Sequence, residues 1–175
     1  MATANRNLSE YNKDFVPNGA GFRIGIVVSE WNDSITLNLL KGAKEVLLDN
    51  GVKEEDIMVR FVPGAFELPL GAQFMCEYTN VDGVIAIGVV IQGETKHFDF
   101  VCEGATQGIK DVNLEYNTPV AFCVLTDNNI QQSIDRSGGK HGNKGIECAI
   151  ACLKMIDLKK SFLKEVGTKT DFTQN

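Results

Sequence analysis

The sequence predicts a single α/β domain, a three-layer α/β/α sandwich around a four-stranded parallel sheet. Four short apolar runs rich in β-branched residues alternate with segments of helical periodicity, and this alternation is typical of parallel strands joined by right-handed crossovers. The run from 84 to 91 is almost unbroken in its apolar character, which indicates a strand buried on both faces at the centre of the sheet. A length of 175 residues fits one domain with a full-sized core.

The two ends of the chain differ in composition from its middle. Residues 1–21 are polar around a few apolar side chains and predict an N-terminal arm, which either docks on a neighbour or stays disordered. The domain is expected to span residues 22–163. Residues 164–175 predict a flexible C-terminal tail.

The first strand is expected over residues 22–29, and a helix follows it after a short turn. Asp33 or Ser34 can cap the start of this helix, and Gly51 can end it. An apolar stripe at helical spacing runs along it: Ile35, Leu39, Ala43, Val46 and Leu47.

The second and third units repeat the pattern of strand and helix. Residues 56–62 predict the second strand, and the next helix has Pro69 in its first turn, where proline is favoured, and ends near Tyr78. Gly93 ends the strand over 84–91 because glycine permits a turn. The following helix is expected from about residue 97 to residue 115.

The last part of the domain predicts one more strand and two more helices. The strand is expected over residues 119–126 and a short helix over 129–136. Residues 137–143 are rich in glycine and predict a loop. The final helix is expected from Lys144 to about Phe162.

The acidic composition restricts the partners that this chain can have. A net charge of −6 and a pI near 4.9 exclude a nucleic-acid partner, because a phosphate backbone requires a basic surface. No apolar run approaches the roughly 20 residues that cross a bilayer, and the polar N-terminus lacks the apolar core of a signal peptide. We therefore expect a cytoplasmic protein without a membrane partner.

The five cysteines are expected to be reduced thiols, because their number is odd and their spacing is irregular. Cys148 and Cys152 lie four residues apart, a spacing that could hold a metal ion. Their neighbours are apolar, however, and no further cysteine or histidine lies close by in the sequence. Thiols that pack as small apolar side chains are the favoured interpretation, so we expect no metal site.

Each predicted strand ends in side chains suited to binding or catalysis. Trp31 follows the first strand, Phe66 and Glu67 follow the second, and Arg136 follows the fourth, ahead of the glycine-rich loop. After the third strand come Gly93, Glu94, Thr95 and His97. Because the carboxyl ends of parallel strands share one edge of the sheet, we expect these residues to meet in one pocket, with an anion site at the helix N-terminus.

Two interpretations remain open for four of these side chains. Trp31 can stack on a planar heterocycle or plug the space between helix and sheet. Glu67 can bind a ligand or cap the helix that follows it. Arg136 can clamp a phosphate or form a surface ion pair. His97 can transfer protons near neutral pH or simply begin a helix.

Three other uses of this fold class are excluded by residues that they require. The loop over 138–145 lacks the Gly-Lys-Ser/Thr ending of nucleotide hydrolases and lies late in the chain, not after the first strand. A phospho-acceptor receiver domain needs a carboxylate after the third strand, where this chain has Gln92 and Gly93. A flavodoxin-type phosphate loop would follow the first strand, but that turn is acidic and contains no glycine.

Four segments of the chain together resemble the signatures of the lumazine synthase family. They are residues 23–32 (RIGIVVSEWN), 62–69 (VPGAFELP), 88–99 (GVVIQGETKHFD) and 136–145 (RSGGKHGNKG). Their order and spacing are similar to those of the family, so the resemblance covers about residues 22–162. It implies a flavodoxin-like fold and the condensation of 5-amino-6-(D-ribitylamino)uracil with 3,4-dihydroxy-2-butanone 4-phosphate in riboflavin biosynthesis. The products would be 6,7-dimethyl-8-ribityllumazine, phosphate and water, and the reaction would use no metal or organic cofactor.

The resemblance assigns a role to each matching residue. Trp31 would stack on the pyrimidine, Glu67 would accept hydrogen bonds from the ribityl chain, and His97 would be the proton shuttle. Arg136 would hold the phosphate together with the backbone amides after the third strand. The implied catalytic residues are His97, Arg136 and Lys144, and the implied substrate-binding residues are Trp31, Asn32, Ala65, Phe66, Glu67, Val89, Val90, Ile91, Gly93, Glu94, Thr95, Phe122 and Glu147.

The resemblance also implies a homo-oligomer. Members of the family form pentamers with active sites between subunits, so Phe122, Arg136 and Lys144 would serve the site of a neighbouring chain. Some of these pentamers gather by twelve into sixty-subunit shells, and the uninserted length of residues 136–144 permits such a shell. The alternatives are a non-catalytic paralogue that binds riboflavin or a related pteridine, and a purely structural cage.

Overall fold

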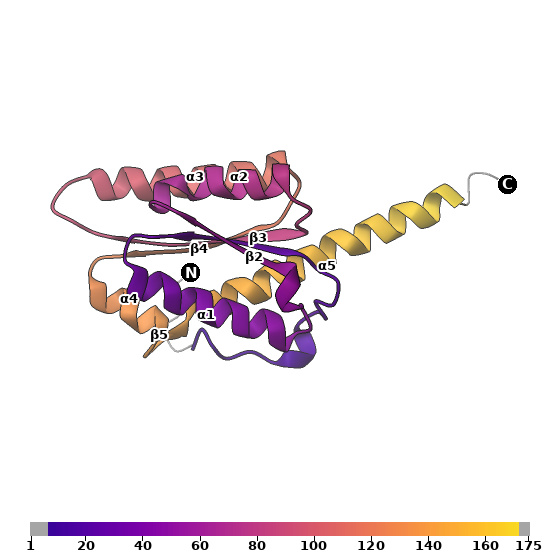
Figure 1. Cartoon of the computed structure of the whole chain (residues 1–175), viewed down its shortest axis with the longest axis horizontal. Helices are drawn as coiled ribbons and strands as arrows, with labels where there is room; N and C mark the ends of the chain where they lie inside the picture. Colours follow the sequence, from indigo (N-terminus) through magenta and orange to yellow (C-terminus); the bar gives the residue numbers. More distant parts are fainter. Residues whose placement is uncertain (1–6, 172–175) are drawn as a thin grey trace.

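Four parallel strands form the centre of the structure in the order β2-β1-β3-β4 (Figure 1). This computed structural model describes the backbone of residues 7–171 and the side chains of residues 7–166. The strands are β1 (Ile24–Ser29), β2 (Ile57–Val62), β3 (Gly83–Ile91) and β4 (Val120–Asp127), and every neighbouring pair is parallel. The predicted four-stranded parallel sheet is therefore confirmed, and the long apolar run forms β3 in its interior.

Helices cover both faces of this sheet, which confirms the predicted three-layer sandwich (Figure 1). One face carries α1 (Asp33–Asp49), α4 (Ile130–Arg136) and α5 (Lys144–Asp171), and the other carries α2 (Leu68–Tyr78) and α3 (His97–Glu115). Short 3-10 turns occur at η1 (Lys13–Phe15), η2 (Glu54–Asp56) and η3 (Ala65–Glu67). Within the described part of the chain, none of the helices combines the length and the apolar character that crossing a bilayer demands.

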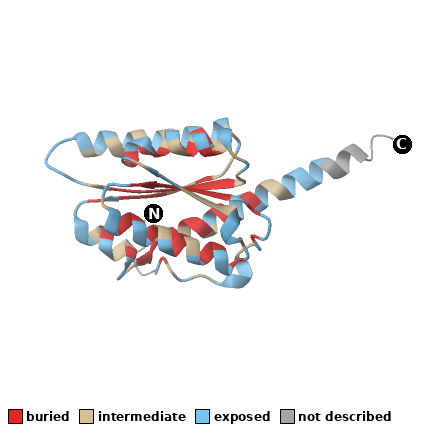
Figure 2. Cartoon of the chain, viewed as in Figure 1, coloured by how far each residue is buried: buried red, intermediate tan, exposed pale blue. Residues whose placement is uncertain are grey.

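The side chains of β3 alternate between two hydrophobic clusters. Ile85 and Ile87 join the cluster against α1 and α5, whereas Val84 and Ala86 join the cluster against α2 and α3. All four side chains are fully buried, and Figure 2 shows the sheet as a buried layer between the helices. Because both faces of the strand pack, its sequence is apolar without alternation.

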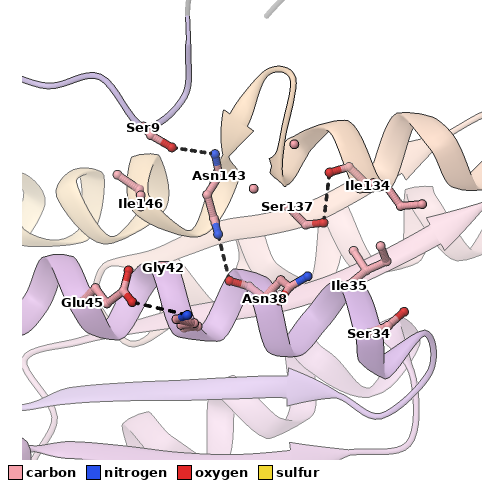
Figure 3. A pocket seen from close by; sticks show the side chains of 13 residues that line it. Ser9, Ser34, Ile35, Asn38, Gly42, Glu45, Ile134, Ser137, Asn143 and Ile146 are labelled. Atoms are coloured by element: carbon pink, nitrogen blue, oxygen red, sulfur yellow. Dashed lines mark hydrogen bonds and ion pairs between the residues drawn. The ribbon is translucent and has the colours of Figure 1, made fainter.

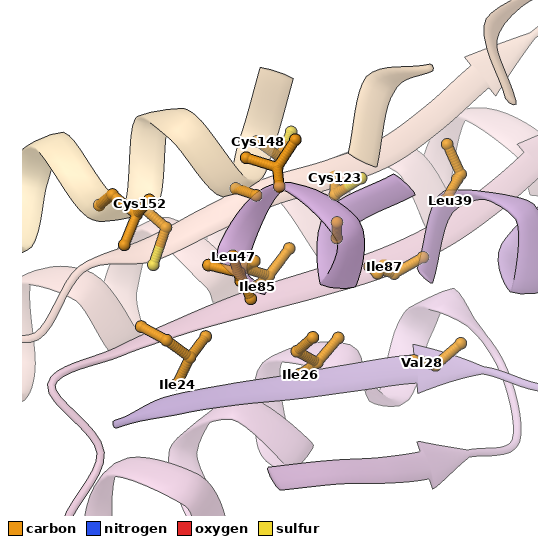
Figure 4. Packing of buried hydrophobic residues seen from close by; sticks show 14 of the residues in the cluster. Ile24, Ile26, Val28, Leu39, Leu47, Ile85, Ile87, Cys123, Cys148 and Cys152 are labelled. Carbon is orange, nitrogen blue, oxygen red and sulfur yellow. The ribbon is translucent and has the colours of Figure 1, made fainter. Parts of the chain in front are cut away.

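Three cysteines pack inside the larger of the two clusters (Figure 4). They are Cys123 on β4 and Cys148 and Cys152 on α5, and all five thiols of the chain are free. Burial raises the pKa of the Cys152 thiol to about 12, so this thiol stays protonated and packs as a small apolar group. The predictions of reduced thiols, and of packing for Cys148 and Cys152, are confirmed.

The described part of the N-terminal arm packs on its own chain, against a hairpin where a loop was predicted. The hairpin consists of β5 (Ser137–Gly139) and β6 (Gly142–Asn143). Leu8 is buried, and its backbone N–H donates to the carbonyl of His141 at 2.7 Å. Ser9 Oγ accepts a hydrogen bond from the Asn143 backbone N–H at 3.0 Å. The described arm thus contacts its own chain through Leu8 and Ser9, and residues 1–6 are outside the described range.

Helix α5 is longer than predicted. It continues to Asp171 instead of ending near Phe162, and it projects beyond the sheet (Figure 1). Its first half is anchored by buried side chains such as Leu153 and Ile156, whereas Phe162 and Leu163 are exposed. The predicted end of this helix is therefore wrong. The division of the chain into arm, domain and tail stays a prediction.

Candidate active site

A cavity of about 710 Å³ opens at the edge of the sheet where the strands end. Its size falls within the range of small-molecule sites. The residues that line it come from the ends of β1 and β3, from the turn after β2 and from the first turn of α3: Trp31, Asn32, Gly64, Ala65, Phe66, Glu67, Val89, Val90, Ile91, His97, Phe100 and Val101. Nine of the sequence-predicted site residues are in this set, so the expected meeting of three strand ends is found.

The turn after β1 presents Trp31 at the mouth of the cavity. The backbone N–H of Glu30 donates to the Val62 carbonyl at 2.9 Å and joins the ends of β1 and β2. Asn32 adopts the left-handed conformation with φ of 58° and occupies the N-cap position of α1, so the predicted caps Asp33 and Ser34 are wrong. Asparagine tolerates this conformation better than most residues. The sharp turn leaves Trp31 73% exposed, which makes it an open stacking face and not a plug.

The turn after β2 brings a carboxylate beside Trp31. A Cβ atom on Gly64 would lie 3.1 Å from Oε2 of Glu67 and 3.5 Å from Cδ1 of Trp31. Glycine therefore gives these two side chains room to approach the same point. Glu67 precedes α2, yet its side chain makes no capping hydrogen bond. Glu67 thus occupies the N-cap position of α2 without a capping hydrogen bond from its side chain, which leaves the carboxylate available to a ligand.

Phe66 and Ala65 form the wall of the cavity between α2 and α3. Ala65 is buried, whereas Phe66 is 60% exposed and lies against Gly104 of α3, where a Cβ atom would come within 2.7 Å of its ring. The cavity therefore has an apolar wall, with Val89, Val90 and Ile91 of β3 beside it.

The turn after β3 leads directly into α3. His97 is the first residue of this helix and is exposed, and its backbone N–H donates to Oγ1 of Thr95 at 3.3 Å. Gly93, Glu94 and Thr95 are also exposed and form the segment between the cavity-lining residues Ile91 and His97. The backbone of this segment is open to an anion at the positive end of the helix dipole.

Besides Gly93, Glu94 and Thr95, four predicted site residues do not line this cavity, and these four lie farther along the chain: Phe122, Arg136, Lys144 and Glu147. They belong to the β4 side of the sheet, where Phe122 is half-buried on the edge strand and Arg136 ends α4. Lys144 and Glu147 are in the first turn of α5 and form an ion pair of 2.8 Å. Within one chain the predicted site is therefore divided between two places.

Lys144 remains an ammonium ion at neutral pH. Burial opposes its charge, but the hydrogen bond from Lys144 to Glu147 and the negative charge of that carboxylate favour the ammonium ion, and the pKa of Lys144 is raised above its ordinary value. The first turn of α5, on the β4 side of the sheet, thus carries a positively charged side chain at neutral pH.

Sequence reasoning missed Gly64, Phe100 and Val101 as lining residues. Phe100 and Val101 lie three and four positions after His97 on α3, which is the spacing of side chains on one helix face. That spacing was available in the sequence and would have identified both residues once His97 was chosen.

A second cavity, of about 630 Å³, lies between α1 and the β5–β6 hairpin (Figure 3). Its polar groups are largely bonded within the chain. The Asn143 amide, for example, donates to the Asn38 carbonyl at 2.8 Å, and its oxygen accepts from the Gly145 backbone N–H at 2.8 Å. None of the sequence-predicted site residues lines this cavity.

The fold and the cavity are typical of an α/β enzyme with a small-molecule site beyond the ends of parallel strands, and Trp31, Glu67 and His97 line this cavity. A sequence model of the 6,7-dimethyl-8-ribityllumazine synthase family matches residues 21–160. The chain therefore belongs to this family, as its four signature segments indicate.

Relatives in several bacteria support the assignment. A 6,7-dimethyl-8-ribityllumazine synthase of Flavobacterium johnsoniae is 63% identical over 160 residues, which are 91% of this chain and 84% of the relative. The enzyme of the same name from Christiangramia forsetii is 58% identical over 91% of this chain and 96% of its own length. One from Lactiplantibacillus plantarum is 50% identical over 84% of this chain and 92% of its own length.

Proposed function

We propose that this chain condenses 5-amino-6-(D-ribitylamino)uracil with 3,4-dihydroxy-2-butanone 4-phosphate to 6,7-dimethyl-8-ribityllumazine, releasing phosphate and water. The observation that carries the proposal is the cavity beyond β1, β2 and β3, in a chain whose family match spans all four signature segments. The relatives bear the name of the same synthase. The reaction belongs to riboflavin biosynthesis.

The cavity suits the ring and the ribityl chain of the first substrate. Trp31 stacks on the pyrimidine, because its ring is exposed at the mouth. Glu67 accepts hydrogen bonds from ribityl hydroxyls, since its carboxylate caps no helix. The remaining contacts come from Asn32, Ala65, Phe66 and the backbone of Val89, Val90 and Ile91, all of which line the cavity.

The second substrate brings a phosphate, which needs hydrogen-bond donors and positive charge. The backbone N–H groups of Gly93, Glu94 and Thr95 offer donors beside the N-terminus of α3. Arg136 adds a planar fork of donors that matches a phosphate. Lys144, with Glu147 as its ion-pair partner, supplies further positive charge.

The reaction then requires a sequence of proton transfers near this phosphate. The amine of the uracil attacks the ketone, and water leaves to give an imine. Phosphate is then eliminated, and the enol that remains tautomerises to a carbonyl. The second nitrogen attacks this carbonyl and closes the ring with loss of a second water. His97 shuttles the protons, because an imidazole can accept and donate near neutral pH. Holding two reactants together contributes a large part of the rate.

The site is completed by a second copy of the chain. Phe122, Arg136 and Lys144 lie on the β4 side and away from the cavity, so they serve the cavity of the next subunit. Contact between two different surfaces of identical chains forms a ring when the rotation between neighbours closes, and we propose the pentamer that the resemblance implies. Twelve such pentamers would form a sixty-subunit shell, since the segment from Arg136 to Lys144 carries no insertion.

Exposed apolar side chains on α3 and α5 fit this assembly. They line a groove of about 400 Å³ beside the start of β4, and Leu114, Met155 and Phe162 are each more than half exposed. Patches of this kind mark contact surfaces.

We place the protein in the cytoplasm, where its five free thiols stay reduced.

The test is an assay with both substrates. The purified protein is mixed with the two compounds, and formation of the lumazine is followed by its absorbance and fluorescence. Product must appear only when both substrates are present. A protein that binds the lumazine or riboflavin but forms no product would contradict the proposal and favour a binding paralogue.

A further inference from the structure

The buried carboxylate of Asp127, the last residue of β4, has no part in the site described above. Its side chain is 8% exposed. Its Oδ2 accepts a hydrogen bond of 2.8 Å from Oγ of Ser133, which is fully buried on α4. A buried carboxylate is costly unless polar groups compensate its charge. Ser133 is one such group, and Arg136 is the other.

Arg136 lies between this carboxylate and its own helix. Its Nη1 is 4.0 Å from Oδ1 of Asp127 and donates to the Gln132 carbonyl at 3.1 Å. Gln132 is itself fixed, because its backbone N–H donates to Oδ1 of Asn129 at 3.1 Å and its Oε1 accepts from the Asn128 backbone N–H at 2.8 Å. The guanidinium therefore has a defined place, although 35% of the side chain is exposed.

We propose that Asp127 is a positioning residue, which holds the guanidinium of Arg136 in the orientation that receives the phosphate group of the substrate. The inference rests on the role proposed above for Arg136. A guanidinium has five N–H donors, and the bond to Gln132 engages one of them. The others remain available to phosphate.

The geometry indicates that Asp127 assists phosphate binding and does not compete with it. At 4.0 Å the carboxylate is beyond hydrogen-bonding distance of Nη1, so a phosphate breaks no hydrogen bond to Asp127 when it binds. The hydrogen bond from Ser133 keeps the carboxylate in its buried place. What Asp127 supplies is a fixed negative charge that restricts where the guanidinium can lie.

The backbone of Asp127 also fixes the other proposed phosphate-binding element. Its carbonyl accepts a hydrogen bond from the Gln92 backbone N–H at 2.9 Å, directly before the turn that begins at Gly93. A side-chain substitution leaves this bond in place. Kinetic changes on substitution of Asp127 would therefore report on the carboxylate.

The first test is Asp127→Asn, which removes the charge and keeps the shape and an acceptor for Ser133. We expect the KM for the phosphate substrate to rise about two- to tenfold, which corresponds to ordering one flexible side chain on binding. The inhibition constant of inorganic phosphate should rise by the same factor, whereas kcat and the KM for the ribitylaminouracil should stay within about twofold. An unchanged KM for the phosphate substrate would overturn the inference, and a lower one would show that the carboxylate competes with phosphate.

Asp135→Asn is the matched control. It removes the same charge one position from Arg136, but the Asp135 carboxylate accepts a hydrogen bond from Gln131 and makes no ion pair with the guanidinium within the described residues. Its kinetic constants should equal those of the unmodified protein. If both variants raise the KM for the phosphate substrate equally, the effect is one of net charge and the inference is wrong.

A double-mutant cycle separates positioning from general damage to the fold. In an Arg136→Ala background, Asp127→Asn should have no further effect on the KM for the phosphate substrate, because the group that it positions is gone. A further rise there would overturn the inference. If Asp127→Asn does not fold, as judged by urea unfolding, Ser133→Ala takes its place and should raise the same KM by a smaller factor.

The same variants distinguish failure of this inference from failure of the proposed phosphate-binding role of Arg136. If Arg136→Ala leaves the KM for the phosphate substrate unchanged, the role of Arg136 is wrong and the inference falls with it. If Arg136→Ala raises that KM and Asp127→Asn does not, only the role of Asp127 is wrong.

Discussion

The residues beyond β1, β2 and β3 and the residues on the β4 side are placed differently within one chain. The first set, here the pocket half, lines a cavity and includes Trp31, Glu67 and His97. The second set, here the β4 half, consists of Phe122, Arg136, Lys144 and Glu147, none of which lines that cavity. The pocket half leaves its aromatic ring and carboxylate free, whereas the charges of the β4 half are already paired.

This difference teaches how a single small domain can supply two functions. The pocket half offers shape and hydrogen-bonding groups to a ligand, and the β4 half offers charges whose positions are fixed by contacts within the chain. A chain that carries both halves at different edges would be complementary to a copy of itself, as the proposed shared site requires. Three predictions, in order of decreasing effect, examine whether the halves work in this way.

The largest effect is expected in the pocket half, from His97→Ala. Turnover should fall by roughly a hundred- to ten-thousandfold, the range typical of general acid–base catalysis. His141→Ala is a matched control, because the only other histidine lies in the hairpin turn and does not line the cavity. Turnover is measured from lumazine formation with both substrates saturating. Equal turnover in the His97 variant and the unmodified protein would remove His97 from the mechanism.

The second prediction concerns the sharing of halves between chains. In a His97→Ala chain the β4 half is unchanged, and in an Arg136→Ala chain the pocket half is unchanged. When the two variants are co-expressed in equal amounts, about one quarter of the normal number of sites should be active. In one quarter of random neighbour pairs, an unchanged pocket half lies beside an unchanged β4 half.

The control for this mixture is the same pair of variants purified separately and mixed without dissociation, which should stay as inactive as each variant alone. Activity is measured per chain after co-purification with two different tags. If the co-assembled protein shows no recovery, while both variants fold and associate, each site uses both halves of one chain and the comparison fails.

The smallest effect is expected from Trp31→Ala, which removes the stacking face of the pocket half. The KM for the ribitylaminouracil should rise about three- to tenfold, in line with the energy of one aromatic stacking contact. Trp31→Phe should restore most of the affinity because it keeps a flat ring. Phe15→Ala, at an equally exposed aromatic residue of η1, should change nothing. A similar KM in the Trp31→Ala variant would show that the ring does not contact the substrate.

The pocket half could be predicted from the sequence because its causes are local. An unbroken apolar run places β3 in the interior of a parallel sheet, and the topology then brings the strand ends to one edge. What the sequence left open was the use of each side chain. That depended on exposure and bonding, such as the missing cap bond of Glu67 and the open face of Trp31.

Other features could not be predicted because they depend on contacts between distant segments. The hairpin over 137–143 is held by the arm, through hydrogen bonds to Leu8 and Ser9 that no local pattern reveals. Helix α5 passes through Gly167, a residue that commonly marks the end of a helix. A single glycine in a helix interior lowers the stability of the helix by only about 1 kcal/mol. The preceding turns of α5 offset this cost, so the helix continues through Gly167.

The direction of α5 has a practical consequence. The helix starts beside the carboxyl end of β4 and runs back past the opposite end of the sheet (Figure 1), over a length of about 42 Å at 1.5 Å per residue. A fluorescent label or a surface tether joined after Asp171 would therefore stand far from Trp31. Immobilising the protein by that end should leave the entrance for substrate unobstructed.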